Sequence, residues 1–200
     1  MLTENEVGQL LDIPEVSRIV HQLHQAFTEE ETELRDISLH DFLSGVLLAP
    51  SVALAQVDGT TSLFEELSLN KKARRFSKGG FFLRHDPVVK MIILLQTRFQ
   101  HWEQRFFQAL KQILKTVVPE ISSDYEQHNG DSTQPVTLFM NSSYILIRFL
   151  ETFFLPEGEE ISNKRRISYL EFQKITSIGE QLRLSKLGSF RNFVTTFEVK

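Results

Sequence analysis

The sequence predicts an all-α fold in which six to seven helices pack around one long central helix at about residues 87–118. Glycine and proline are scarce, at 9 and 6 of 200 residues, below their usual shares of about 7% and 5%, and this disfavours turn-rich all-β folds. Apolar residues recur at helical spacing along most of the chain. No repeat of about 20–50 residues is visible, which argues against a solenoid. We therefore expect residues 1–200 to form a single helical domain.

The first part of the chain predicts four helical segments. They are expected at residues 4–12, 14–28, 39–49 with a continuation to 57, and 61–78. Pro14 suits the first turn of the second helix, whereas Pro50 is expected to kink or restart the third. In the fourth helix, acidic residues come first and a basic run comes last, and both placements suit the helix dipole. The Gly79–Gly80 pair then ends it.

The long central helix is the best defined of the predicted elements. Asp86 followed by Pro87 is a strong helix start, and Pro119 ends the pattern. Apolar residues alternate in steps of four and three, forming a heptad seam: Val88, Ile92, Leu95, Phe99, Trp102, Phe106, Ala109 and Ile113. A second face carries glutamines in steps of four: Gln96, Gln100, Gln104, Gln108 and Gln112. These glutamines predict either a solvated stripe or a contact with a partner helix.

The last part of the chain predicts two further helices separated by loops. Residues 120–136 are polar and predict a loop, and residues 137–155 predict a strongly apolar helix. After a loop at 156–160, we expect Ser162 to cap a helix over 163–183. The tail at 190–199 fits helical spacing but also has strand propensity, and we predict a helix.

Composition and missing motifs exclude several functions. The absence of cysteine excludes disulfides, thiol nucleophiles and zinc–thiolate sites. The acidic start does not fit a secretory signal, and the uncharged run 42–57 is short for a membrane span. No Gly-x-Ser-x-Gly or phosphate-loop motif occurs. We expect no catalytic residues, no cofactor, no membrane contact and a cytoplasmic location, so an enzyme is disfavoured.

Four histidines are candidate ligands for a metal ion or a tetrapyrrole. His21 and His24 stand three residues apart on one predicted helix face, a spacing that suits a metal ion, but the sequence offers no third ligand in a known pattern. His85 and His101 are the histidines to consider for a tetrapyrrole in a helical pocket. The structural interpretation is favoured for all four, and we predict no metal site.

Charge is unevenly distributed along the chain. Residues 1–66 hold 13 acidic and 2 basic residues, whereas residues 67–118 hold 2 acidic and 11 basic residues. The two regions would attract each other if they pack together, which is the favoured interpretation. The alternative is a basic face for an anionic partner. Its candidate residues are Lys71, Lys72, Arg74, Arg75 and Lys78.

Residues 178–193 resemble a helix-turn-helix. Gly179 would lie near the turn, and Ser185 would open a second helix carrying Lys186 and Arg191 as DNA contacts. Two positions depart from the pattern: Arg183 stands where the turn usually has glycine, and Ser189 stands where a core residue belongs. The alternative is an ordinary helix hairpin.

Three functional hypotheses follow from the sequence. The first is a non-enzymatic helical interaction or regulatory protein that self-associates, because the heptad seam is longer than a monomer of this size needs. The second is a nucleic-acid-binding regulator that uses the basic segment 71–78 or the region 178–193. The third is a helical sensor that holds an apolar ligand against its phenylalanines, of which the chain has 17.

Overall fold

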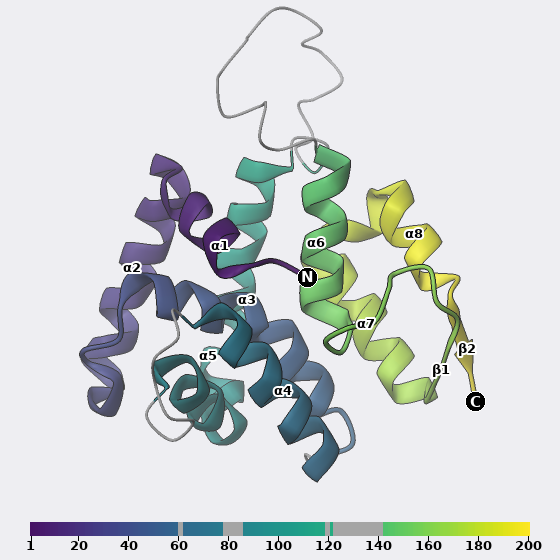
Figure 1. The fold of residues 1–200 in the computed structure, drawn as a ribbon, viewed down its shortest axis with the longest axis horizontal. Helices are drawn as coiled ribbons and strands as arrows, with labels where there is room; N and C mark the ends of the chain where they lie inside the picture. The colour runs from purple at the N-terminus through teal and green to yellow at the C-terminus, as the bar shows by residue number, and fades with distance from the viewer. Residues whose placement is uncertain (60–61, 78–85, 119–120, 122–141) are drawn as a thin grey trace, which may run out of the picture.

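The fold was analysed in a computed structural model of the chain, which describes residues 1–59, 62–77, 86–118, 121 and 142–200. The described residues contain eight α-helices: α1 (Glu4–Leu11), α2 (Pro14–Glu30), α3 (Leu39–Ala55), α4 (Leu63–Phe76), α5 (Pro87–Val117), α6 (Ser142–Phe154), α7 (Tyr169–Gln181) and α8 (Gly188–Val194). The all-α prediction is confirmed (Figure 1). Most of the predicted loop at 120–136, together with Lys78, Gly79, Gly80 and His85, lies outside the described residues.

The long helix α5 packs against α2, α3 and α4. Asp86 caps it by accepting hydrogen bonds from the backbone N–H groups of Val88 and Val89, at 3.0 and 3.2 Å. Every residue of the predicted heptad seam is buried. Four of the five row glutamines are exposed and Gln96 is half-buried. The seam therefore belongs to the core of this chain, and the glutamines form mainly a solvated face.

Helix α3 is the most enclosed element of the fold. All of its residues except Leu39 and Leu54 are buried, because α5, α4 and α6 pack around it. The break expected at Pro50 is absent, since α3 runs through this residue as one helix. Packing contacts around α3 thus offset the free-energy cost of the backbone hydrogen bond that proline cannot donate in a helix interior. Ser51, the next residue, faces the end of α6.

The acidic and basic regions of the sequence meet where α2 ends beside α5. Glu30 contacts Arg105 at 2.5 Å and His101 at 2.6 Å, and the buried Glu31 contacts Arg98 at 2.8 Å. Opposite charges at this junction are neutralised within the chain. Part of the uneven charge distribution is therefore accounted for by ion pairs that hold the end of α2 against α5.

The C-terminal part differs from its prediction. A helix over 163–183 is wrong at its start, because residues 165–167 form strand β1 (Arg165–Ile167) and α7 begins only at Tyr169. Ser168, rather than the expected Ser162, caps α7, and it forms a capping box with Glu171. A helix through 199 is also wrong: α8 ends at Val194, and the tail forms β2 (Phe197–Val199).

The two short strands pair in parallel, with Arg165 opposite Phe197 and Ile167 opposite Val199. They lie beside α7 at the edge of the fold, near the C-terminus (Figure 1). Two 3-10 turns complete the described structure, η1 (Thr32–Leu34) and η6 (Leu184–Lys186). None of the described helices combines the length and the apolar character needed to cross a membrane.

Candidate functional site

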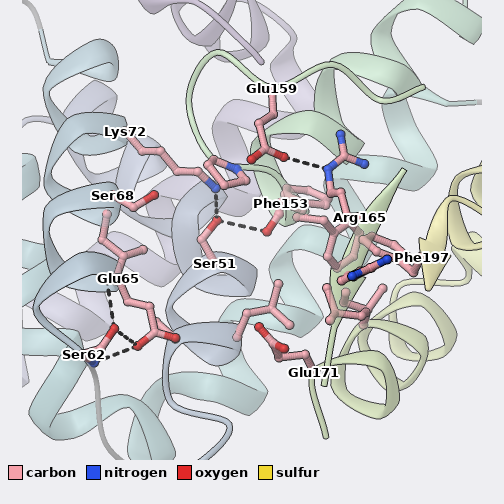
Figure 2. A pocket seen from close by; sticks show the side chains of 18 residues that line it. Ser51, Ser62, Glu65, Ser68, Lys72, Phe153, Glu159, Arg165, Glu171 and Phe197 are labelled. Carbon is pink, nitrogen blue, oxygen red and sulfur yellow. Dashed lines mark hydrogen bonds and ion pairs between the residues drawn. The ribbon is translucent and has the colours of Figure 1, made fainter. Parts of the chain in front are cut away.

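A pocket of about 590 Å³ lies where α3, α4, the end of α6, the small sheet and α7 meet (Figure 2). Pockets for small molecules usually measure about 300–1,000 Å³. Half of its lining residues are apolar and the other half are charged or polar; the large apolar side chains include Leu54, Leu69, Phe153, Phe154, Ile175 and Phe197. We call this cavity the Lys72 pocket, because a buried lysine lines it.

Lys72 reaches the pocket because of its position on α4. It follows Leu69 by three residues and precedes Phe76 by four, so it shares the face of α4 that carries these two buried side chains. Its neighbours Lys71 and Arg74 point to solvent. Only 4% of Lys72 is exposed, which is rare for a lysine.

The amine of Lys72 is held by two acceptors. Its Nζ atom donates to Ser51 Oγ at 2.7 Å and to the Thr152 carbonyl at 3.1 Å. Ser51 Oγ in turn lies 3.0 Å from the carbonyls of both Thr152 and Phe153. These carbonyls belong to the last turn of α6, where no helical N–H group is available to them. The lysine and the serine therefore join α3, α4 and α6 at the pocket.

Burial changes the protonation of Lys72. It lowers the pKa of the Lys72 ammonium from the usual 10.5 to about 7, and the Glu159 carboxylate opposes this shift only in part. Among the described residues, no carboxylate lies within ion-pair distance of Nζ. A substantial fraction of Lys72 is consequently neutral near pH 7.

The other charged side chains around the pocket have partners within the chain. Arg165 contacts Glu159 at 2.7 Å, and Arg166 contacts Glu198 at 3.4 Å. Glu65 and Glu171 each complete a capping box at the start of their own helix, α4 and α7. The rim therefore has little net charge to offer to an ionic ligand.

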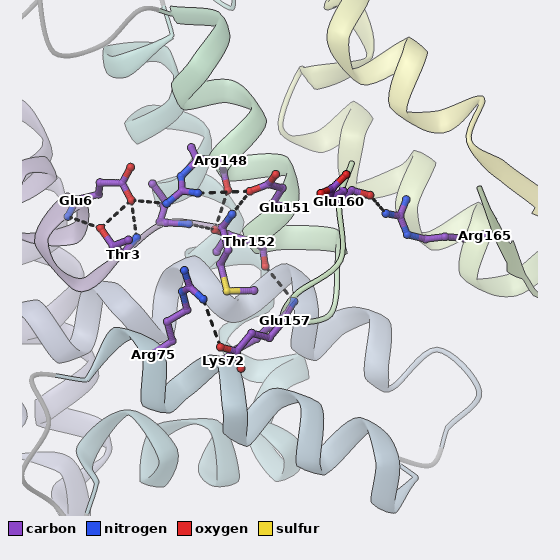
Figure 3. A network of polar contacts seen from close by, with 12 residues as sticks. Thr3, Glu6, Lys72, Arg75, Arg148, Glu151, Thr152, Glu157, Glu160 and Arg165 are labelled. Atoms are coloured by element: carbon purple, nitrogen blue, oxygen red, sulfur yellow. Dashed lines mark hydrogen bonds and ion pairs between the residues drawn. The ribbon is translucent and has the colours of Figure 1, made fainter. Parts of the chain in front are cut away.

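A second polar network lies next to the pocket, on the far side of Thr152 (Figure 3). Thr152 Oγ1 accepts from the backbone N–H of Leu2 at 2.9 Å. Arg148 contacts Glu6 at 3.0 Å and Glu151 at 3.8 Å, and Glu151 also binds the amine of Met1. Burial raises the pKa of Glu6, but hydrogen bonds from Arg148 and Thr3 outweigh it and hold that pKa below its usual range. The network fixes α1 on α6.

The predicted basic segment is divided by the structure. Lys71, Arg74 and Arg75 are exposed, whereas Lys72 is buried in the pocket. Arg75 contacts Glu157 at 3.3 Å. In the described part of the segment, two exposed cations, Lys71 and Arg74, share one face of α4.

The region 178–193 forms two helices, but not as expected. Gly179 lies inside α7, and the second helix begins at Gly188 rather than at Ser185, which lies in η6. Phe190 packs so closely on Gly179 that an added Cβ would come within 2.2 Å of its ring. Lys186 and Arg191 are both exposed. They remain candidate DNA contacts, on or beside a helix of only seven residues.

The candidate ligand histidines have other partners. His21 Nδ1 lies 2.9 Å from the Ser17 carbonyl, and His24 Nε2 lies 2.8 Å from the Ile37 carbonyl. His101 is exposed and contacts Glu30. Over the described ranges, no group of three or more acidic or histidine side chains could hold a metal ion.

Comparisons with protein-family models, with curated protein sequences and with solved structures found no match.

The sequence predicts Lys72 as one of several cations on a basic face, and it does not single out Ser51 or Thr152. One feature of the sequence could have separated Lys72 from its neighbours: it is the only cation of the run placed between Leu69 and Phe76 on one helix face. Ser51 and Thr152 lie 101 residues apart in the sequence, and only the packing of α3 on α6 brings them together.

Proposed function

We propose that this protein is a helical ligand-binding protein, whose Lys72 pocket takes a small molecule with an apolar body and a hydrogen-bond-accepting head. The observation that carries the proposal is an amine, almost fully buried, that lines a pocket together with several large apolar side chains. Perturbed ionisable groups in pockets are concentrated at functional sites.

The chemistry of the walls supports an apolar body. Phe153 and Phe154, at the end of α6, and Phe197, in β2, line the same cavity. A ligand that covered these walls would remove apolar surface from water, at about 25 cal/mol per Å². Its acceptor head would lie toward Lys72, whose ammonium form has a third N–H group beyond the two that Ser51 Oγ and the Thr152 carbonyl accept. This proposal develops the sensor hypothesis of the sequence.

The structure offers less support for self-association and for nucleic-acid binding than for ligand binding. The heptad seam that suggested self-association is buried in the chain's own core, so a second copy would have to use another surface. The basic segment that suggested nucleic-acid binding contributes its most distinctive lysine to the pocket. Both hypotheses remain predictions, and the pocket gives neither of them support.

Nile red, a neutral dye with an apolar ring system and a carbonyl acceptor, tests the proposal by fluorescence titration. Ser68 is half-buried and lines the pocket, so Ser68→Phe should fill the cavity and weaken dye binding about ten-fold. Lys72→Met removes the amine and should weaken binding about five-fold, the value of one hydrogen bond.

The matched controls are on the same helix. Glu66→Phe adds the same ring to the exposed side of α4, and Lys71→Met removes an exposed charge one residue from Lys72. Both should bind the dye as the unchanged protein does. Equal dye binding by Ser68→Phe and Glu66→Phe would show that the dye does not occupy the pocket, and would overturn the proposal.

A further inference from the structure

We propose that Lys72 forms a reversible imine with an aldehyde or ketone bound in the Lys72 pocket. This inference rests on the proposed function and specifies its ligand: the hydrogen-bond-accepting head would be a carbonyl group. The chemistry is that of a nucleophilic amine desolvated in an apolar site.

The hydrogen bonds of Nζ match a neutral amine. A neutral amine has two N–H groups and one lone pair, whereas an ammonium has three N–H groups. Among the described residues, Nζ has two acceptors, Ser51 Oγ and the Thr152 carbonyl. They satisfy both N–H groups of the neutral form and leave the lone pair free. In the ammonium, a third buried N–H would lack a partner among the described residues.

The surroundings of the amine favour a neutral head over an anionic one. With Lys72 neutral, the charged side chains that line the pocket are three carboxylates, Glu65, Glu159 and Glu171, and two cations, Arg165 and Arg166. Both cations are already paired with carboxylates, Arg165 with Glu159 and Arg166 with Glu198, so an anionic head would find no unpaired cation among these side chains. A carbonyl head brings no charge into the cavity, and its carbon is the atom that a lone pair attacks.

Protonation supports the same chemistry at neutral pH. With a pKa of about 7, Lys72 is roughly half neutral at pH 7. An exposed lysine with a pKa near 10.4 is neutral in only about one molecule in a few thousand. The lower basicity makes each neutral amine somewhat less nucleophilic, but the gain in neutral amine is larger.

The reaction is balanced without an oxidant or reductant. The Nζ lone pair adds to the carbonyl carbon, and a proton moves from nitrogen to the carbonyl oxygen, giving a carbinolamine. The carbinolamine hydroxyl then takes up a proton from solvent, the C–O bond breaks and water leaves, and the nitrogen lone pair forms the C=N bond of a protonated imine. The protonated imine keeps one N–H group, and Ser51 Oγ and the Thr152 carbonyl are both placed to accept from it.

The experiment treats the full-length chain with 2-naphthaldehyde, traps imines with sodium borohydride and maps the modified residues by mass spectrometry. At pH 7, Lys72 should be modified at least ten-fold faster than the exposed Lys71. The rate at Lys72 should rise through about pH 7 and then level off. Ser68→Phe keeps the amine but fills the pocket, and should slow modification of Lys72 about ten-fold.

Two results would overturn the inference. One is modification of Lys72 no faster than that of Lys71, and the other is an unchanged rate at Lys72 in Ser68→Phe. Nile red separates this failure from failure of the proposed function. If the dye occupies the pocket but Lys72 is not modified faster, imine formation is wrong and ligand binding stands. If the dye also fails to distinguish Ser68→Phe from Glu66→Phe, both are wrong.

Discussion

At the scale of single residues, burial and hydrogen bonding have different effects on Lys72: burial changes its pKa, and hydrogen bonds fix its position. Desolvation weakens the charged form, and two acceptors hold the amine in place. The same residue satisfies the Thr152 carbonyl at the end of α6, so it also serves the fold. A position with both roles is expected to make stability depend on pH.

Lys72→Met should make the free energy of unfolding less dependent on pH above neutrality. In the unfolded chain Lys72 holds its proton up to about pH 10.5, but in the folded chain only up to about pH 7. Between these values unfolding takes up a proton, so rising pH stabilises the folded protein. The unchanged protein should therefore gain up to about 4 kcal/mol relative to Lys72→Met between pH 7 and 10.5.

Urea unfolding at several pH values measures this difference. Lys71→Met is the control, because Lys71 is exposed and its loss should leave the pH dependence as it is. Parallel curves for the unchanged protein and Lys72→Met would contradict the account. Glu159, the carboxylate that acts on Lys72, is present in all three proteins.

Arg183→Gly should stabilise the protein by about 0.5–1 kcal/mol. Arg183 has φ 61° and ψ 19°, a left-handed conformation that costs free energy for any residue with a side chain. In the helix-turn-helix pattern that residues 178–193 resemble, the position of Arg183 is usually glycine. The backbone at Arg183 has the left-handed conformation that glycine favours. Thermal unfolding measures the effect, and a loss of stability would show that the arginine side chain contributes more than the strain costs.

At the scale of elements, the junction of α2 with α5 combines packing with hydrogen bonding. Glu31 is buried, accepts from Trp102 Nε1 at 2.8 Å and pairs with Arg98 at 2.8 Å. Arg98 has φ −119° and ψ 15°, and α5 is kinked at this residue. The carboxylate at the end of α2 thus bridges two side chains of α5, one at the kink and the other a turn later.

Glu31→Ala should destabilise the protein by about 2–3 kcal/mol, because it leaves the buried Trp102 N–H without its acceptor. Trp102 is the single tryptophan, so its fluorescence reports both the local change and unfolding. The control is Glu30→Ala, which removes the same charge from the adjacent exposed position. A loss for Glu31→Ala no greater than that for Glu30→Ala would contradict the assigned role.

The same scale shows what the sequence could predict. Asp86 and Pro87 marked the start of α5 correctly, because a cap and a first-turn proline act locally. The cap of α7 was placed wrongly at Ser162, although Ser168 and Glu171 have the spacing of a capping box. The pocket was not readable, since Ser51 and Thr152 meet only through the packing of α3 on α6. Local rules define helix ends, whereas burial of Lys72 depends on tertiary contacts.

At the scale of the whole molecule, one continuous core runs through the described chain. The buried side chains form a single cluster that includes residues from Met1 to Phe193. The heptad seam of α5 lies in this cluster, together with the enclosed helix α3. The seam is therefore expected to stabilise the monomer.

Phe106→Ala should lower the free energy of unfolding by about 3–5 kcal/mol, because it opens a cavity in this core. Phe106 packs against Phe27, Phe42 and Trp102, with ring centroids 5.7–6.1 Å apart. The loss should be the same at low and high protein concentration in urea unfolding. A loss that grows with concentration would place the seam in an interface between copies instead.

The account depends most on a neutral amine in the pocket, and the pKa of Lys72 measures it directly. The chain would be labelled with ¹³C at the lysine ε-carbons, and their NMR signals followed from pH 5 to 11, with Lys72→Met identifying the signal of Lys72. The account predicts that the Lys72 signal titrates near pH 7. A Lys72 signal that titrates near the usual lysine value of about 10.4 would contradict the account, because the amine would then be charged at neutral pH.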